Sequence, residues 1–167
     1  MVFIAKLLKA LSSDASPWQL ALGIMFGMLV GLTPLLRLHN LIVLFIVLFF
    51  RVNLSTFLIA LSLFSGLAYL LDPAMITIGE SLLTHESLQS FWTALYNSDI
   101  GLLSQFFHTL TLGSFVLSVL LCPIVLFTSK ILIVQYRERF MAYIEKLKIV
   151  AFLKGTKLYQ LFKTLGD

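Results

Sequence analysis

Residues 17–36 read PWQLALGIMFGMLVGLTPLL, and this stretch decides the class of fold. It contains no charged residue, and its length is about that of a helix crossing the hydrocarbon core of a bilayer. Ser16 and Pro17 suit a helix start, because serine caps free backbone amides and proline is tolerated in the first turn. We therefore expect a membrane helix here that Pro34 interrupts near its far end.

The composition of the whole chain favours a membrane location. Hydrophobic residues make up 59% of the 167 residues, charged residues only 12%, and the mean hydropathy is +0.99. Soluble domains are about 25% charged, and a fold of this size cannot bury so large an apolar share, because small domains leave much of their surface exposed. These values argue against a soluble enzyme, a nucleic-acid-binding module and a disordered chain.

The segment after Pro34 is apolar but short. As a helix, residues 41–50 would extend about 15 Å, which is half of the hydrocarbon core. The broken pair at residues 17–53 therefore either crosses the membrane twice or forms a Gly-rich re-entrant hairpin. We favour the hairpin, because the two arms are unequal in length.

The rest of the chain contains two further spans. The first ends at Asp72-Pro73, because the residue before a proline is driven out of helical geometry, and the second is kinked at Cys122-Pro123. The sequence thus predicts a single all-α membrane domain, a helical bundle with three to four membrane segments. Its parts are an interfacial helix at 1–15, the broken helical pair at 17–53, a span at 54–71, an acidic interfacial connection at 74–107, a span at 109–134 and a basic amphipathic tail at 135–167.

Charge is distributed unevenly along the chain, in the way that sets membrane topology. No lysine or arginine occurs between Asp72 and His108, whereas most of the chain's 12 basic residues follow from Lys130 onward. Basic segments stay on the cytoplasmic side of a membrane. We therefore expect both termini to be cytoplasmic and the acidic connection to lie on the opposite side.

Small residues recur at intervals of four and predict faces for helix packing. In lipid, such residues let two backbones approach closely, and dispersion forces hold the helices together. A glycine face that exposes its backbone to a ligand is the alternative interpretation. The predicted packing residues are Gly23, Gly27 and Gly31 in the first helix, Ser62 and Gly66 in the third segment, and Ser114 and Ser118 in the last span.

A polar cluster interrupts the apolar pair and is the most suggestive feature of the sequence. Ionisable groups near the membrane interior are costly and often mark the path of a substrate. These cations and amides suit an anionic head group, such as a lipid phosphate. The alternative is that both arginines reach phosphates at the interface and only fix the depth of the helices. The candidate head-group-binding residues are Arg37, His39, Asn40, Arg51 and Asn53.

The sequence offers little that suits catalysis or metal binding. The three histidines are scattered without a partner at helical spacing, and the single cysteine, Cys122, permits neither an intramolecular disulfide nor a thiolate metal cluster. The sequence contains no nucleotide-binding fingerprint. We expect no enzymatic activity, no metal, no cofactor and no nucleic-acid partner.

Residues 16–73 resemble the sequence pattern of a known protein family. Its elements are SPWQLALG at 16–23, Gly27, Gly31, Pro34, His39 and the Arg51-Val52-Asn53 triplet. These residues resemble a family of small bacterial inner-membrane proteins that is catalogued as a domain of unknown function, and a related domain is found fused to glycosyltransferases. The family usually has a glycine in the turn where this chain has Leu35, Leu36 and Arg37, and often Asn-Pro where it has Asp72-Pro73. The resemblance implies the inner membrane of a Gram-negative bacterium and a large envelope-protein partner.

These observations lead to two competing functional hypotheses. The first is a non-enzymatic inner-membrane subunit or anchor of an envelope assembly that handles lipids or anionic head groups. Its expected partners are membrane lipids and either further copies of the chain, in a homo-oligomer, or a larger envelope protein. The alternative is an autonomous small transporter or flippase for a lipid or solute, which would use the same polar cluster.

Overall fold

Every regular element in the described part of the chain is a helix. The computed structural model describes residues 15–50 and 52–146, with side chains as far as Arg139, and it contains no β-strand in these ranges. The all-α class predicted from the sequence is confirmed. Residues 1–14 of the predicted interfacial helix, Arg51 and the predicted tail beyond Lys146 lie outside the described residues.

The first described helix, α2 (Pro17–Leu32), begins where the sequence predicts. The Ser16 hydroxyl accepts a hydrogen bond from the backbone N–H of Gln19 at 3.2 Å, and the Gln19 side chain accepts one from the backbone N–H of Ser16 at 3.0 Å. This reciprocal capping box satisfies two amide donors at the helix start. The backbone is extended at Thr33, directly before Pro34, so α2 ends there.

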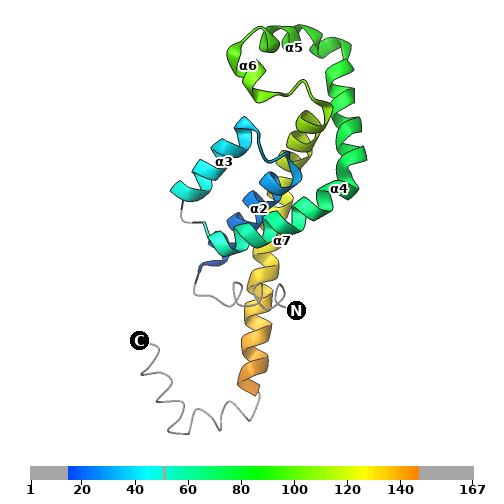
Figure 1. Cartoon of the computed structure of the whole chain (residues 1–167). Coiled ribbons are helices and arrows are strands. Elements are labelled where there is room, and N and C mark those ends of the chain that lie inside the picture. Colours follow the sequence, from blue (N-terminus) through cyan, green and yellow to red (C-terminus); the bar gives the residue numbers. More distant parts are fainter. Residues whose placement is uncertain (1–14, 51, 147–167) are drawn as a thin grey trace.

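The next helix, α3 (Leu38–Phe49), brings the chain back toward the start of α2 (Figure 1). Beyond α3, the backbone N–H of Asn53 donates to the Gln19 carbonyl at 3.3 Å. The segment between Gln19 and Asn53 therefore leaves one end of the molecule and returns to it.

Two long helices, α4 (Leu54–Thr84) and α7 (Thr109–Lys146), form the rest of the helical body. Each contains a proline, Pro73 in α4 and Pro123 in α7. The prediction that Asp72-Pro73 ends a helix is wrong, since α4 continues through it.

Packing beyond the proline explains why α4 continues. Proline in a helix removes one backbone hydrogen bond and commonly bends the helix. Beyond Pro73, however, Met75 is fully buried and Gly79 lies directly against α7. Figure 1 shows α4 changing direction between the part that lies along α2 and the part that rises away from it.

Three short helices connect α4 to α7. The short helices predicted for the acidic connection are present, although the connection begins at His85 rather than at residue 74. Trp92 ties them to α4, because its indole Nε1 donates to the Leu82 carbonyl at 2.9 Å. The three helices are η1 (Glu86–Leu88), α5 (Gln89–Tyr96) and α6 (Asp99–Ser104).

The glycine face of α2 lies against the first half of α4, not against α3. A Cβ atom added at Gly27 would lie 2.7 Å from the Ala60 Cβ and 2.9 Å from the Leu61 backbone nitrogen. Gly23 and Gly31 approach α4 in the same way, one turn before and one turn after. Three successive turns of α2 thus approach α4 closely enough to exclude side chains.

A second glycine contact joins α4 to α7. A Cβ added at Gly113 would fall on the Met75 carbonyl, and one added at Gly79 would fall on the Thr109 carbonyl. On α7, Ser114 and Ser118 are fully buried close to this contact.

The other small-residue face predicted from the sequence is uncovered. Ser62 and Gly66 are exposed, and no described atom lies within 4 Å of a Cβ added at Gly66. Within the described residues, this face of α4 therefore packs against nothing.

Large apolar side chains cover much of the surface. Leu36, Phe49 and Leu70 are 95%, 86% and 78% exposed. Two helical segments, Leu54–Thr84 and Thr109–Arg139, are long and apolar enough to cross a membrane, while α2 and α3 are apolar but shorter. The structure thus contains two candidate spans where the sequence predicts three to four membrane segments.

Candidate functional site at the α2–α3 turn

The turn between α2 and α3 is held together by a buried pair of polar side chains. The Thr33 hydroxyl lies 2.8 Å from Asn40 Oδ1 and 2.9 Å from the Leu29 carbonyl. Asn40 Nδ2 donates to the Pro34 carbonyl at 2.9 Å. Asn40 is only 1% exposed, so its amide closes the turn and has no access to a ligand.

His39 is buried between aromatic rings from elsewhere in the chain. Its imidazole stacks on Phe106 at a centroid distance of 5.8 Å and lies 5.1 Å from the ring of Phe115. Neither ring nitrogen has a hydrogen-bond partner among the described residues. Burial, and secondarily the positive charge of Arg37, lowers the pKa of His39 to about 4, so the ring is neutral near pH 7.

Arg37 is the cation of this turn. It occupies the position before the first residue of α3, and its Nε atom is buried without a hydrogen-bond partner in the described part of the chain. Buried polar groups in proteins are nearly always paired. The unpaired nitrogens of Arg37 and His39 therefore mark the turn as a place where a further polar group, such as a phosphate oxygen or water, would be stabilised.

Asn53 lies far from this turn. It follows α3, whereas Arg37 precedes it, and twelve helical residues separate two positions by about 18 Å. Asn53 Oδ1 accepts a hydrogen bond from the Thr56 backbone N–H at 2.9 Å and so caps α4. The structure thus brings Arg37, His39 and Asn40 together and separates them from Asn53.

A cavity of about 290 Å³ lies beside the turn. Its lining includes Thr33, Pro34, Tyr69 and Asp72, from the end of α2 and the middle of α4. Within the described residues, no basic side chain pairs with Asp72 at ion-pair distance. A carboxylate without such a partner among these residues is unusual in a candidate span, because charged groups at membrane depth are costly.

The polar groups of the turn can contact an anionic group. The described residues contain no group of three or more histidine, cysteine, aspartate or glutamate side chains that could hold a metal ion. Arg37 offers a cationic donor, while the buried His39 and Asn40 shape the turn around it. The arrangement therefore fits recognition of an anionic group at the end of α2.

Sequence reasoning missed several residues of this site. Thr33 pairs with Asn40 across seven positions, and Phe106 and Phe115 enclose His39 from more than sixty residues away. The Thr33-Pro34 pair carries a local signal, since threonine before proline is typical of a helix end. The contacts of Phe106 and Phe115 with His39 depend on how the chain between α4 and α7 folds back toward α3, and no local sequence pattern indicates them.

The fold and the turn define the class of protein: an α-helical protein with two helices of membrane-spanning length and a polar turn between two shorter apolar helices. The chain belongs to the bacterial family described as "Uncharacterized protein conserved in bacteria (DUF2062)", whose model matches residues 2–141. This match confirms the family resemblance and extends it well beyond residues 16–73. Neither a curated protein nor a solved structure matches the chain.

Proposed function

We propose that this protein is a non-enzymatic integral subunit or anchor in the bacterial inner membrane, with α4 and α7 crossing the bilayer and both termini in the cytoplasm. The observation that carries this proposal is the separation of charge between the two ends of an apolar helical body. Lys130, Arg137 and Arg139 lie toward the free end of α7, opposite α5 and α6 (Figure 1). Glu86 and Asp99 lie in the connection at the other end. Basic segments are retained in the cytoplasm.

The α2–α3 turn supplies the proposed point of contact with lipid. His39 stacks on Phe106, so the turn lies at the end of the molecule that carries the acidic connection. Arg37 is then positioned to bind an anionic head group of the outer leaflet. The protein would anchor a larger envelope assembly or present such a lipid to it.

Affinity purification in mild detergent, followed by protein and lipid mass spectrometry, tests the proposal. We expect wild-type protein to co-purify with an envelope protein or with further copies of itself, and with anionic lipid that Arg37→Gln reduces. Lys130→Gln is the matched control, because it removes the same charge at the opposite end. Recovery of the protein in the soluble fraction after alkaline carbonate extraction would contradict the membrane location.

One observation favours the alternative of an autonomous transporter or flippase. Asp72 lines the cavity beside the turn and lies within a candidate span, as acidic residues of transport paths do. The two functions differ in their response to substitution. A transporter should lose flux in Arg37→Ala and Arg51→Ala while its complexes stay intact, whereas an anchor should lose co-purifying partners in these variants.

A further inference from the structure

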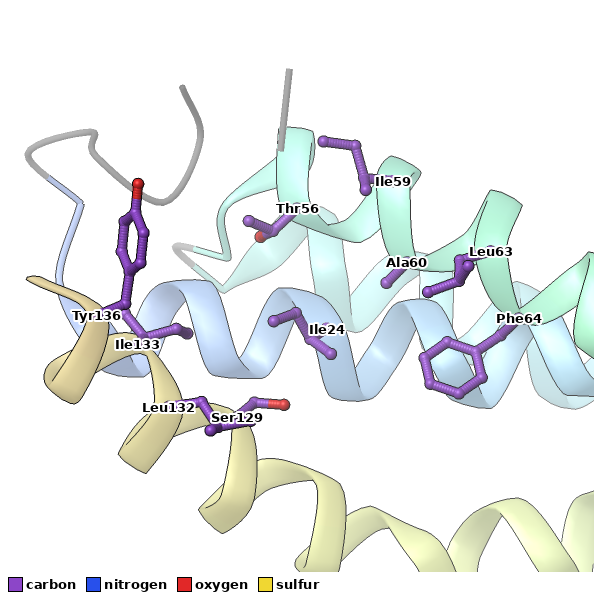
Figure 2. Close-up of a pocket in the computed structure, with 10 residues that line it drawn as sticks. All are labelled: Ile24, Thr56, Ile59, Ala60, Leu63, Phe64, Ser129, Leu132, Ile133 and Tyr136. Carbon is purple, nitrogen blue, oxygen red and sulfur yellow. The ribbon is translucent and has the colours of Figure 1, made fainter. Parts of the chain in front are cut away.

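An apolar groove of about 420 Å³ lies where α2, α4 and α7 meet, away from the α2–α3 turn (Figure 2). Ile24 of α2 lies along its centre, Ile59 and Leu63 form part of the α4 wall, and Ser129 and Leu132 form part of the α7 wall. Ligand sites commonly have volumes of about 300–1,000 Å³. The groove is therefore large enough for a molecule or part of one.

The lining of the groove selects an apolar occupant. Its side-chain polar atoms are three hydroxyls, and that of Thr56 already donates to the Asn53 carbonyl at 2.9 Å. From Ser129 to Tyr136 the α7 wall rises about 10 Å, which suits an extended chain better than a compact polar molecule. A fatty acyl chain is both apolar and extended, and acyl chains are the most abundant groups of this kind in a bilayer.

One end of the groove is basic. Arg139 follows Tyr136 by three residues and Leu132 by seven, so all three occupy one face of α7. Arg139 is exposed. On the neighbouring flank, Arg137 donates to the Ala15 carbonyl at 2.8 Å, and the exposed Glu138 lies between the two arginines in the sequence. A phosphate above the groove would meet a complementary charge.

We propose that the groove binds an acyl chain of an anionic phospholipid from the leaflet on the basic side, with the lipid phosphate at Arg139. This inference rests on the proposed membrane location, but it uses none of the turn residues. It assigns a lipid to each end of the molecule: a head-group contact at Arg37 and an acyl-chain site between α4 and α7.

Filling the groove tests the acyl-chain part of the proposal. Full-length protein is reconstituted in nanodiscs of phosphatidylcholine and phosphatidylglycerol, extracted in mild detergent, and its retained lipids are counted by native mass spectrometry. Ser129→Phe places a ring in the groove, and Thr128→Phe places the same ring at the neighbouring exposed position. We expect Ser129→Phe to lower the bound-lipid population severalfold and Thr128→Phe to leave it within twofold. Ile59→Trp fills the opposite wall and should reproduce the loss.

Removing single charges tests the head-group part. Arg139→Gln should lower the preference for phosphatidylglycerol over phosphatidylcholine by about fivefold, because one basic residue near an anionic lipid strengthens binding by about that factor. Lys130→Gln removes an equal charge whose Nζ lies 4.0 Å from the centre of the Trp18 ring, outside the groove. This control should change the preference by less than twofold.

Two outcomes overturn the proposal. If Ser129→Phe and Ile59→Trp are folded and retain lipid as the wild type does, the groove is not a lipid site. If they instead abolish a dimer without changing the bound lipid, a second copy of the chain occupies the groove. Carbonate extraction reports separately on the membrane location, so its failure is distinguishable from the failure of the lipid site.

Discussion

The helical body is joined by two glycine contacts that differ in extent. Along α2, Gly23, Gly27 and Gly31 face α4 over three turns, and the nearest atom of α4 would lie less than 3.0 Å from each added Cβ. Where α4 meets α7, Gly79 and Gly113 face each other at one crossing, and an added Cβ would fall directly on a carbonyl. The first is an extended contact of repeated small residues, and the second is a single contact of backbone on backbone.

This difference in extent explains why the sequence reveals the first contact but not the second. An extended contact between two helices repeats with the helical period, so Gly23, Gly27 and Gly31 are recognisable from spacing alone. A single crossing needs one glycine in each helix, and Gly79 and Gly113 have no periodic partner. The spacing of the glycines also does not identify the helix against which they pack. In a Gly-rich hairpin this face would pack against the second arm of the broken pair, whereas it packs against α4.

The largest effect is expected from Gly113→Leu. Its side chain would collide with the Met75 carbonyl, and backbone cannot move aside as a flexible side chain can. We expect a loss exceeding about 4 kcal/mol, the exceptional range for one substitution, seen as failure to give a monodisperse species in detergent. Ile124→Leu in the same helix changes an exposed residue and is the control. Normal folding of Gly113→Leu would contradict this contact.

The next effect is that of Gly27→Leu. Here the obstruction includes the Ala60 Cβ as well as backbone, and the helices can separate slightly. Overpacking typically costs about 1–3 kcal/mol. Thermal unfolding in detergent, followed by tryptophan fluorescence, should show a lower midpoint. If Gly27→Leu proved more damaging than Gly113→Leu, the extended contact rather than the crossing would dominate stability.

The candidate site shows a similar limit of sequence reasoning. The polarity of Arg37, His39 and Asn40 within an apolar stretch identifies the turn, because such residues are rare there. The pattern does not distinguish a ligand-facing amide from one that closes a turn. Asn40 bonds to Thr33 and Pro34, and Asn53 caps α4, so both amides serve the fold.

Asn40→Ala tests this structural role. The substitution removes the hydrogen bond to the Pro34 carbonyl and leaves the buried Thr33 hydroxyl without its side-chain partner. The Thr33 hydroxyl keeps the Leu29 carbonyl as an acceptor, so each lost hydrogen bond should cost about 0.5–1.5 kcal/mol and thermal stability should fall. Asn97→Ala, at an exposed position, should stay within about 0.5 kcal/mol. Equal effects of the two variants would argue against the buried pair.

A smaller, pH-dependent effect is expected from His39. Its pKa falls from 6.5 in the unfolded chain to about 4 in the folded protein, mainly through burial. Between these values the unfolded state binds more protons, so stability decreases as the pH is lowered from 6.5 toward 4. His39→Phe keeps an aromatic ring against Phe106 and Phe115 but cannot titrate. Unfolding measured between pH 4 and 8 should therefore depend less on pH in this variant than in the wild type.

The smallest effect, and the one of opposite sign, is expected from Gly66→Leu. The substitution is chemically the same as Gly27→Leu, and both glycines lie within helices. No described atom approaches the position of a Cβ at Gly66, so only the better helix propensity of leucine acts. We expect a gain of about 0.5 kcal/mol in the same unfolding measurement. A loss of stability that grows with protein concentration would instead show that Ser62 and Gly66 pack against another copy, because only an association between chains makes stability depend on concentration.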